Sequence, residues 1–220
     1  MKRFDGILFD LDGTLIDSAP DLAAAVDKMR IERGMPSLPF DLYRPMTGTG
    51  ARGMLGVAFD VTPDSPQFEA MREEFFCNYE ADLVTRTEVF DGVTSVLDAL
   101  TQSEVPWGVV TNKSERFVLP LSRQMPLLRD AKVLIAGDTT PHAKPHPEPL
   151  LEALRRLGLD AGRCLYVGDD LRDVQAAHAA GMTAAVACYG YLGEAGDPAG
   201  WGAEFLLDTP DALLNLLNSA

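Results

Sequence analysis

The sequence predicts an α/β fold, in which a doubly wound, mostly parallel sheet carries an inserted α-helical domain. Three observations support this prediction. Short apolar runs of strand length recur along the chain, and stretches of helical character separate most of them. The chain has 220 residues, which is enough for one such domain and an insertion. One interval after the first apolar run breaks the alternation and contains only predicted helices.

The predicted strands are apolar throughout and do not alternate with polar residues. Strands of this kind are typical of a parallel sheet whose two faces are both covered by helices. The strands are expected at 7–9, 107–110, 133–136, 164–167, 183–187 and 205–207. The helices between them are expected at 93–101, 115–123, 147–157, 170–180 and 209–217.

The interval that breaks the alternation follows the first strand. Helices are predicted at 20–33, 42–47, 50–59 and 67–80, and prolines mark the connections between them. We therefore expect a helical domain at 18–84, inserted into an α/β domain made of residues 1–17 and 85–220.

The charge of the chain limits its partners. A net charge of −14 disfavours nucleic acid and anionic membrane, because both are polyanions. A small phosphorylated metabolite remains compatible, since a metal ion or a lysine can reverse the field within one pocket. No apolar run approaches the roughly 20 residues that cross a bilayer, and the N-terminus does not resemble a signal peptide. We expect a cytoplasmic protein; the sequence does not distinguish a monomer from a homodimer.

Polar residues follow several of the predicted strands. In a doubly wound sheet, ligands bind beyond the carboxyl ends of the strands, so these residues are expected to meet at one edge. They are Asp10, Asp12, Thr14, Thr111, Asn112, Lys113, Lys144, Asp169, Asp170 and Asp173.

The acids of this set predict a metal site. Asp10, Asp12 and Asp169 would crowd negative charge, which is costly without a counter-charge. Mg²⁺ prefers oxygen ligands and commonly binds through one or two carboxylates, waters and a phosphate. The sequence therefore predicts Mg²⁺ as the cofactor.

The remaining groups suit a phosphate. Thr111 and Asn112 can donate hydrogen bonds, and Lys144 offers a point charge to phosphate oxygens. The turn at Gly13 and Thr14 is expected to add backbone N–H groups that face an anion.

The spacing of the first two acids suggests a division of labour. An aspartate can attack phosphorus and form an aspartyl-phosphate, while a second acid protonates the leaving oxygen and then activates water. Asp10 lies at the predicted strand end and Asp12 on the following loop. We therefore expect Asp10 to be the nucleophile and Asp12 the general acid and base.

Four segments resemble the haloacid dehalogenase superfamily. DLDGTL at 10–15 resembles its first motif, and TN at 111–112, KP at 144–145 and GDDLRD at 168–173 resemble the second, third and fourth, in the same order. The resemblance covers almost the whole chain. It implies a Rossmannoid sheet with helices on both faces and a mobile helical cap inserted after the first motif.

The resemblance also implies roles for single residues. Asp10 corresponds to the nucleophile and Asp12 to the general acid and base. Asp170 stands where many relatives have Ser, and either caps the following helix or alters metal affinity. The implied magnesium ligands are the side chains of Asp10 and Asp169 and the backbone carbonyl of Asp12; the phosphate-binding residues are Thr111, Asn112 and Lys144; the supporting residues around them are Thr14, Asp170 and Asp173.

The helical insert offers candidates for substrate specificity. Thr47, Gly48 and Arg52 belong to the segment TGTGAR, where glycines expose N–H groups at a helix start and Arg52 can bind a carboxylate. A flexible loop between helices is the alternative interpretation. The overall pattern resembles phosphoglycolate phosphatases, and some stretches resemble phosphatases that act on N-acetylmuramic acid 6-phosphate. Both substrates carry a carboxylate.

The same residues bear on three classes of protein other than a phosphatase. A dehalogenase needs neither an acid for an alkoxide nor a metal, so Asp12 and Asp169 argue against it. A phosphomutase uses a comparable acid and base and is excluded only weakly. A non-enzymatic phospho-accepting receiver groups similar residues around Mg²⁺, but it needs about half this length and has no helical insert.

Overall fold

The structure is a computed structural model that describes residues 4–193 and 195–218. The chain forms two compact units, one of Met1–Ile16 with Val89–Ala220 and the other of Asp17–Glu88. The sequence-based division places residues 17 and 85–88 with the α/β part, whereas here they belong to the helical unit. The reason is the buried carboxylate of Asp21, which accepts hydrogen bonds from the backbone N–H groups of Arg86 and Thr87 at 2.8–2.9 Å.

The first unit is built on a six-stranded sheet in the order β5-β4-β1-β6-β7-β8. All of its pairings are parallel, which confirms the predicted fold class. Its strands are β1 (Gly6–Phe9), β4 (Trp107–Val110), β5 (Leu134–Ile135), β6 (Cys164–Gly168), β7 (Thr183–Ala187) and β8 (Phe205–Leu207).

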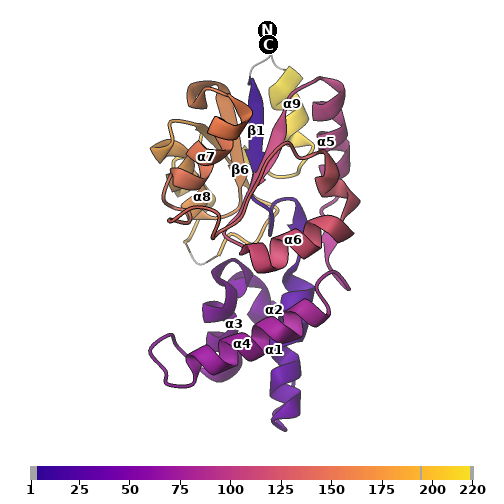
Figure 1. Cartoon of the computed structure of the whole chain (residues 1–220), viewed down its shortest axis with the longest axis vertical. Helices are drawn as coiled ribbons and strands as arrows, with labels where there is room; N and C mark the ends of the chain where they lie inside the picture. Colours follow the sequence, from indigo (N-terminus) through magenta and orange to yellow (C-terminus); the bar gives the residue numbers. More distant parts are fainter. Residues whose placement is uncertain (1–3, 194, 219–220) are drawn as a thin grey trace. The chain divides into compact units, whose positions relative to one another are not determined.

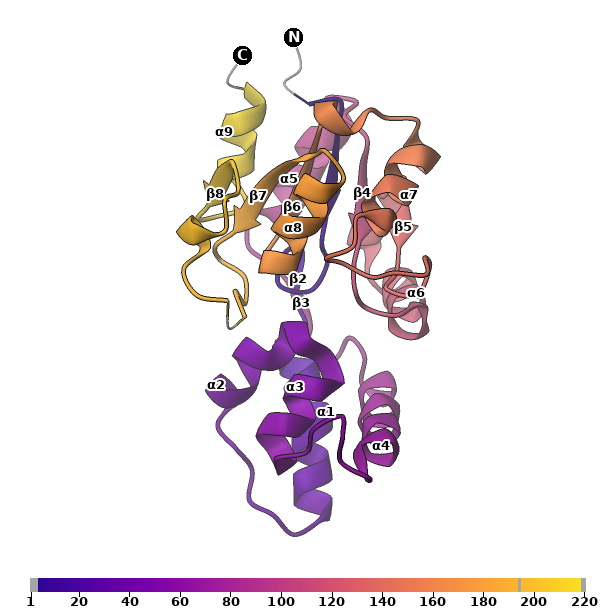
Figure 2. The same ribbon diagram turned by 90° about the vertical axis from the view of Figure 1, so that its left-hand side faces the viewer.

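Helices cover both faces of this sheet (Figures 1 and 2). Leu8 and Tyr166 point into the apolar core formed with the helices at 148–157 and 171–179, whereas Phe9 and Val167 face Val93 and Leu213 on the other side of the sheet. Because successive side chains of a strand point to opposite faces, strands buried on both sides must be apolar throughout. The helices are α5 (Val93–Gln102), α6 (Glu115–Gln124), α7 (Glu148–Leu157), α8 (Leu171–Ala179) and α9 (Ala212–Asn218), with short 3₁₀ turns η2 (Pro126–Asp130), η3 (Ala161–Arg163) and η4 (Pro198–Gly200).

The second unit is helical. The single helix expected at 42–47 is wrong, because the chain forms α2 and then η1 there. Pro45 near the start of η1 has no N–H to continue an α-helical ladder. Gly50, with φ of 61°, then lets the chain turn into α3. Its elements are α1 (Ala19–Glu32), α2 (Phe40–Tyr43), η1 (Arg44–Thr49), α3 (Gly50–Phe59) and α4 (Phe68–Ala81).

The chain passes between the units through two short strands, β2 (Ile16–Asp17) and β3 (Glu88–Val89), which pair with each other. They were not predicted from the sequence, because two-residue strands carry no periodic signal. Across the described residues, every helix is too short or too polar to cross a lipid bilayer.

The close packing of β4 against β5 generates a stability prediction. A Cβ atom at Gly108 would lie 2.4 Å from Val133 Cγ1 and 2.9 Å from Val133 O, so Gly108→Ala should lower the free energy of unfolding by about 1 to 3 kcal/mol. Gly200→Ala is the matched control, because no heavy atom lies within 4 Å of its added Cβ. Urea unfolding of both variants measures the difference; equal stabilities would contradict this account of the packing.

Candidate active site

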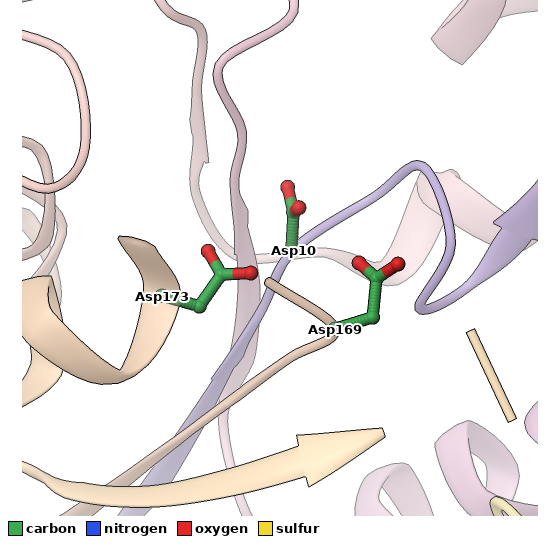
Figure 3. Close-up of side chains that lie close together, drawn as sticks. All are labelled: Asp10, Asp169 and Asp173. Carbon is green, nitrogen blue, oxygen red and sulfur yellow. The ribbon is translucent and has the colours of Figure 1, made fainter. Parts of the chain in front are cut away.

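Three carboxylates meet at the carboxyl edge of the sheet (Figure 3). Asp10 follows β1, Asp169 follows β6 and Asp173 lies in the first turn of α8; one oxygen from each lies within 4.8 Å of the others. β1 and β6 are neighbours in the sheet, which is why segments about 160 residues apart in the chain come together here. The donor set is all oxygen and carries excess negative charge, so it fits a hard divalent cation such as Mg²⁺.

Asp10 is held rigidly at the strand end. Its backbone N–H donates to Val167 O at 2.8 Å, which continues the pairing with β6. Its buried Oδ1 is paired with the Lys144 ammonium at 3.0 Å. Burial raises the pKa of Asp10 to about 6, with Asp173 and Asp12 adding to the effect and Lys144 opposing it. Such a carboxylate is poised to take a cation or an electrophile.

Asp169 is fixed by the backbone around it. Its Oδ1 accepts from the Thr14 hydroxyl at 3.3 Å, and its Oδ2 accepts from the Tyr191 N–H at 2.8 Å. Gly13 passes so close that an added Cβ would lie 2.0 Å from Oδ2, and its φ of 86° also favours glycine. Burial, reinforced by Asp10 and Asp173, raises the pKa of Asp169 well above its usual range.

Lys144 provides the counter-charge and is almost fully buried. Its ammonium donates to Tyr166 Oη and Asp173 Oδ1, both at 2.7 Å, and to Val110 O at 3.0 Å. Burial alone would lower the pKa of Lys144, but the carboxylates of Asp10 and Asp173 outweigh it and raise that pKa. Lys144 is therefore charged and committed to the acidic cluster.

Asn112 holds the backbone of Lys144. Its Nδ2 donates to Lys144 O and its Oδ1 accepts from Lys144 N, both at 2.9 Å. Thr111 is buried beside it, and its hydroxyl oxygen accepts from the Lys113 N–H at 3.1 Å. The three residues whose side chains are expected to bind phosphate therefore lie close together, two after β4 and one in the loop before α7.

Asp12 lies outside the carboxylate cluster. Its side chain pairs with the Lys113 ammonium at 3.0 and 3.2 Å. The expectation that Gly13 and Thr14 offer their N–H groups to an anion is wrong. These groups donate to Ile16 O at 2.9 Å and Leu11 O at 3.3 Å, because the turn itself uses them.

Asp170 caps α8. Its side chain accepts from the Arg172 N–H at 2.9 Å, and the Asp173 side chain accepts from the Asp170 N–H, which completes a capping box. The guanidinium of Arg172 also binds Asp170 through two hydrogen bonds of 2.8 and 2.7 Å. These bonds outweigh burial and lower the pKa of Asp170. The helix-cap interpretation of Asp170 is confirmed.

Comparison with known proteins identifies the family of this chain. A sequence model of the haloacid dehalogenase-like hydrolases matches residues 7–187. The chain belongs to this family. The resemblance seen in the sequence is confirmed, and the chain is a member of a family of hydrolytic enzymes.

Relatives of this haloacid dehalogenase-like hydrolase include phosphatases of two kinds. An N-acetylmuramic acid 6-phosphate phosphatase of Pseudomonas aeruginosa is 38% identical over 218 residues, covering 99% of this chain and 96% of that protein. A phosphoglycolate phosphatase of Xanthomonas campestris pv. campestris is 46% identical over 207 residues, covering 94% and 93%. A crystal structure named as a predicted phosphoglycolate phosphatase from Haemophilus somnus 129pt aligns with a TM-score of 0.86 at 28% identity, covering 98% and 99%.

Some site residues were not identified from the sequence of this hydrolase. Tyr166 contacts Lys144, and its signal was a hydroxyl in an otherwise apolar strand. Lys113 was expected at this edge without an assigned role, and its ammonium contacts Asp12. Tyr191 acts through its backbone N–H, which leaves no side-chain signal. Conversely, Thr47, Gly48 and Arg52 belong to the helical unit, and their part in substrate binding stays a prediction.

The raised pKa of Asp169 generates a prediction on pH. Its carboxyl holds a proton to higher pH in the folded than in the unfolded chain, where the pKa is near 3.8, so stability of the metal-free protein falls as pH rises through this window. Asp169→Asn removes the buried charge and should stabilise the EDTA-treated protein by about 1 to 3 kcal/mol at pH 8. The gain should shrink toward pH 4.5.

Urea unfolding at both pH values, with the exposed Asp98→Asn as control, measures this effect. A gain that is independent of pH would contradict the assignment of the buried charge to Asp169.

Proposed function

We propose that the chain is a Mg²⁺-dependent phosphomonoester hydrolase that forms an aspartyl-phosphate on Asp10. The observation that carries this proposal is the buried strand-end carboxylate of Asp10, which is paired with the Lys144 ammonium at 3.0 Å and lies beside the carboxylates of Asp169 and Asp173. A carboxylate nucleophile reacts in its ionised form, which a nearby positive charge favours. The phosphatase names of the relatives support the same activity.

The residues that would hold Mg²⁺ are the side chains of Asp10 and Asp169 and the backbone carbonyl of Asp12, with Asp173 beside them. When bound, the ion neutralises charge on the carboxylates and on the oxygens of the phosphoryl group. Thr14 and the Tyr191 N–H keep the Asp169 carboxylate oriented toward the site.

In the first step, a carboxylate oxygen of Asp10 attacks phosphorus, and the bond from phosphorus to the leaving oxygen breaks. Asp12 gives its proton to that oxygen, so the product leaves as an alcohol. Thr111, Asn112 and Lys144 are the proposed phosphate-binding residues, and Lys144 also neutralises the acidic cluster.

In the second step, water attacks the phosphorus of the aspartyl-phosphate. Asp12 is now a carboxylate and takes the proton of that water, and the bond from phosphorus to the Asp10 oxygen breaks. Free phosphate is released and both aspartates return to their starting states. The location of Asp12 on the loop after β1, beside but outside the acidic cluster, suits a group that must reach the leaving oxygen.

The proposed substrate is 2-phosphoglycolate, hydrolysed to glycolate and phosphate. The 46% identical relative and the structure with TM-score 0.86 favour it. N-acetylmuramic acid 6-phosphate is the second candidate, because a relative of that activity aligns over 99% of this chain. The helical unit is proposed to act as a mobile cap whose Thr47, Gly48 and Arg52 select the substrate. The cytoplasmic location and the monomeric or homodimeric state stay predictions.

The roles of the two aspartates generate the first functional prediction. Asp10→Asn should abolish phosphate release because no nucleophile remains, and Asp12→Ala should lower kcat by about 100- to 10,000-fold because both proton transfers lose their carrier. EDTA should stop the wild-type reaction, and added Mg²⁺ should restore it.

Phosphate release is measured with 2-phosphoglycolate, and the exposed Asp208→Asn serves as the control that keeps full activity. Turnover of the Asp12→Ala variant close to that of the control would contradict the role of Asp12.

The cap residues generate a second prediction. If Arg52 binds the substrate carboxylate, Arg52→Ala should raise KM by about 10-fold or more for the preferred substrate, because a charge-assisted pair is lost. Side-by-side turnover of 2-phosphoglycolate and N-acetylmuramic acid 6-phosphate also identifies which ester is preferred. Unchanged rates on both esters in the variant would rule out this role of Arg52.

A further inference from the structure

Lys113 is a second lysine at the carboxyl edge of the sheet. Its ammonium contacts both carboxylate oxygens of Asp12, at 3.0 and 3.2 Å. The side chain of Lys113 is only 7% exposed and that of Asp12 16%, so this pair is largely removed from solvent. A partly buried pair of this kind is weakened less by salt than a surface pair.

The backbone of Lys113 is fixed at both ends of the residue. Its N–H donates to Thr111 Oγ1 at 3.1 Å, and its carbonyl accepts from the Gly137 N–H at 2.9 Å. Gly137 itself has no room for a side chain, because an added Cβ would lie 2.3 Å from Asn112 O. The ammonium therefore extends from a rigid base directly beyond β4.

If Asp12 is the general acid, its contact with Lys113 brings the ammonium close to the leaving group. A general acid lies about 2.6 to 3.2 Å from the oxygen that it protonates, so the ammonium that binds the same carboxylate lies within about 6 Å of that oxygen. A carboxylate on the carbon that carries the leaving oxygen would lie between that oxygen and the Lys113 ammonium. A carboxylate many bonds further away does not.

The two lysines have separate surroundings. Lys144 is enclosed by Asp10, Asp173, Tyr166 and the Val110 carbonyl, and it serves the reacting phosphoryl group and the acidic cluster. Lys113 is the cation next to the acid. In a chain with a net charge of −14, a local cation favours the binding of an anionic leaving group. An ammonium has three N–H donors, so Lys113 can contact Asp12 and a carboxylate of the leaving group together.

We propose that Lys113 is a specificity-determining residue that binds a carboxylate of the leaving group. It selects phosphomonoesters in which the carbon bonded to the ester oxygen also bears the carboxylate, the 2-phosphocarboxylates. This inference rests on the proposed phosphatase function and on Asp12 as its acid. It favours 2-phosphoglycolate over a sugar phosphate whose carboxylate lies far from the ester.

The test compares two esters that differ only at this group. 2-Hydroxyethyl phosphate replaces the carboxylate of 2-phosphoglycolate with a neutral CH₂OH. The wild-type protein should prefer 2-phosphoglycolate in kcat/KM, and Lys113→Met should reduce that ratio by about 10- to 100-fold, the effect of one charged hydrogen bond. Inhibition by inorganic phosphate should stay unchanged, because Lys144 is intact.

Two further variants control the experiment. Lys113→Arg keeps the cation and should retain most of the preference, which separates charge from packing. Lys28→Met removes the same charge from an exposed ion pair with Glu32 in the helical unit and should leave the ratio unchanged.

Equal losses on both esters in Lys113→Met would overturn the inference and leave Lys113 acting only through Asp12. An unchanged ratio, or a wild-type protein without preference, would also overturn it while the phosphatase function stands. Failure of the wild-type protein to hydrolyse either ester or N-acetylmuramic acid 6-phosphate in the presence of Mg²⁺ would refute the proposed function, and this inference with it.

Discussion

The repulsion among three carboxylates at one sheet edge is the constraint on which this protein depends. Asp10, Asp169 and Asp173 place oxygens within 4.8 Å of one another, and burial raises the pKa values of the first two. A purely structural site would not retain such a group, because an apolar or neutral set of the same volume would be more stable. The arrangement is stable enough to persist because Lys144 pairs with Asp10 and Asp173. In addition, backbone N–H groups donate hydrogen bonds to Oδ2 of Asp169 and Oδ2 of Asp173.

The sheet supplies the rigidity that this arrangement needs. β1 lies between β4 and β6, so the loops that follow these strands emerge side by side at the same edge. Apolar cores on both faces fix the strands, and the charged groups begin at Asp10, the first residue after β1. Small residues such as Gly13 are needed at this edge because the backbone passes within contact distance of Asp169. The packed sheet therefore supplies the stability of the fold, while the clustered carboxylates at its edge lower the free energy of unfolding.

The distribution of positive charge follows from the chemistry of a family of hydrolases. One lysine, Lys144, neutralises the acids that surround the proposed nucleophile, and another, Lys113, accompanies the proposed acid and base. Asp10 and Asp12 therefore have separate cationic partners, although only one residue separates them in sequence. Asn112 connects the two lysines, since it directly precedes Lys113 in the chain and its side-chain amide binds the backbone of Lys144.

The sequence by itself determined the parallel sheet, its covering helices and the acids, because buried strands must be apolar and strand ends are where ligands bind in such sheets. It also predicted two alternatives for Asp170, a helix cap or an effect on metal affinity, of which the structure shows the cap. It did not determine the partners of those acids. Tyr166 beneath Lys144, the Tyr191 N–H on Asp169 and the pair of Lys113 with Asp12 join segments far apart in the chain. Only the tertiary structure decides such contacts, because they depend on which strands are neighbours and on backbone groups that every residue type shares.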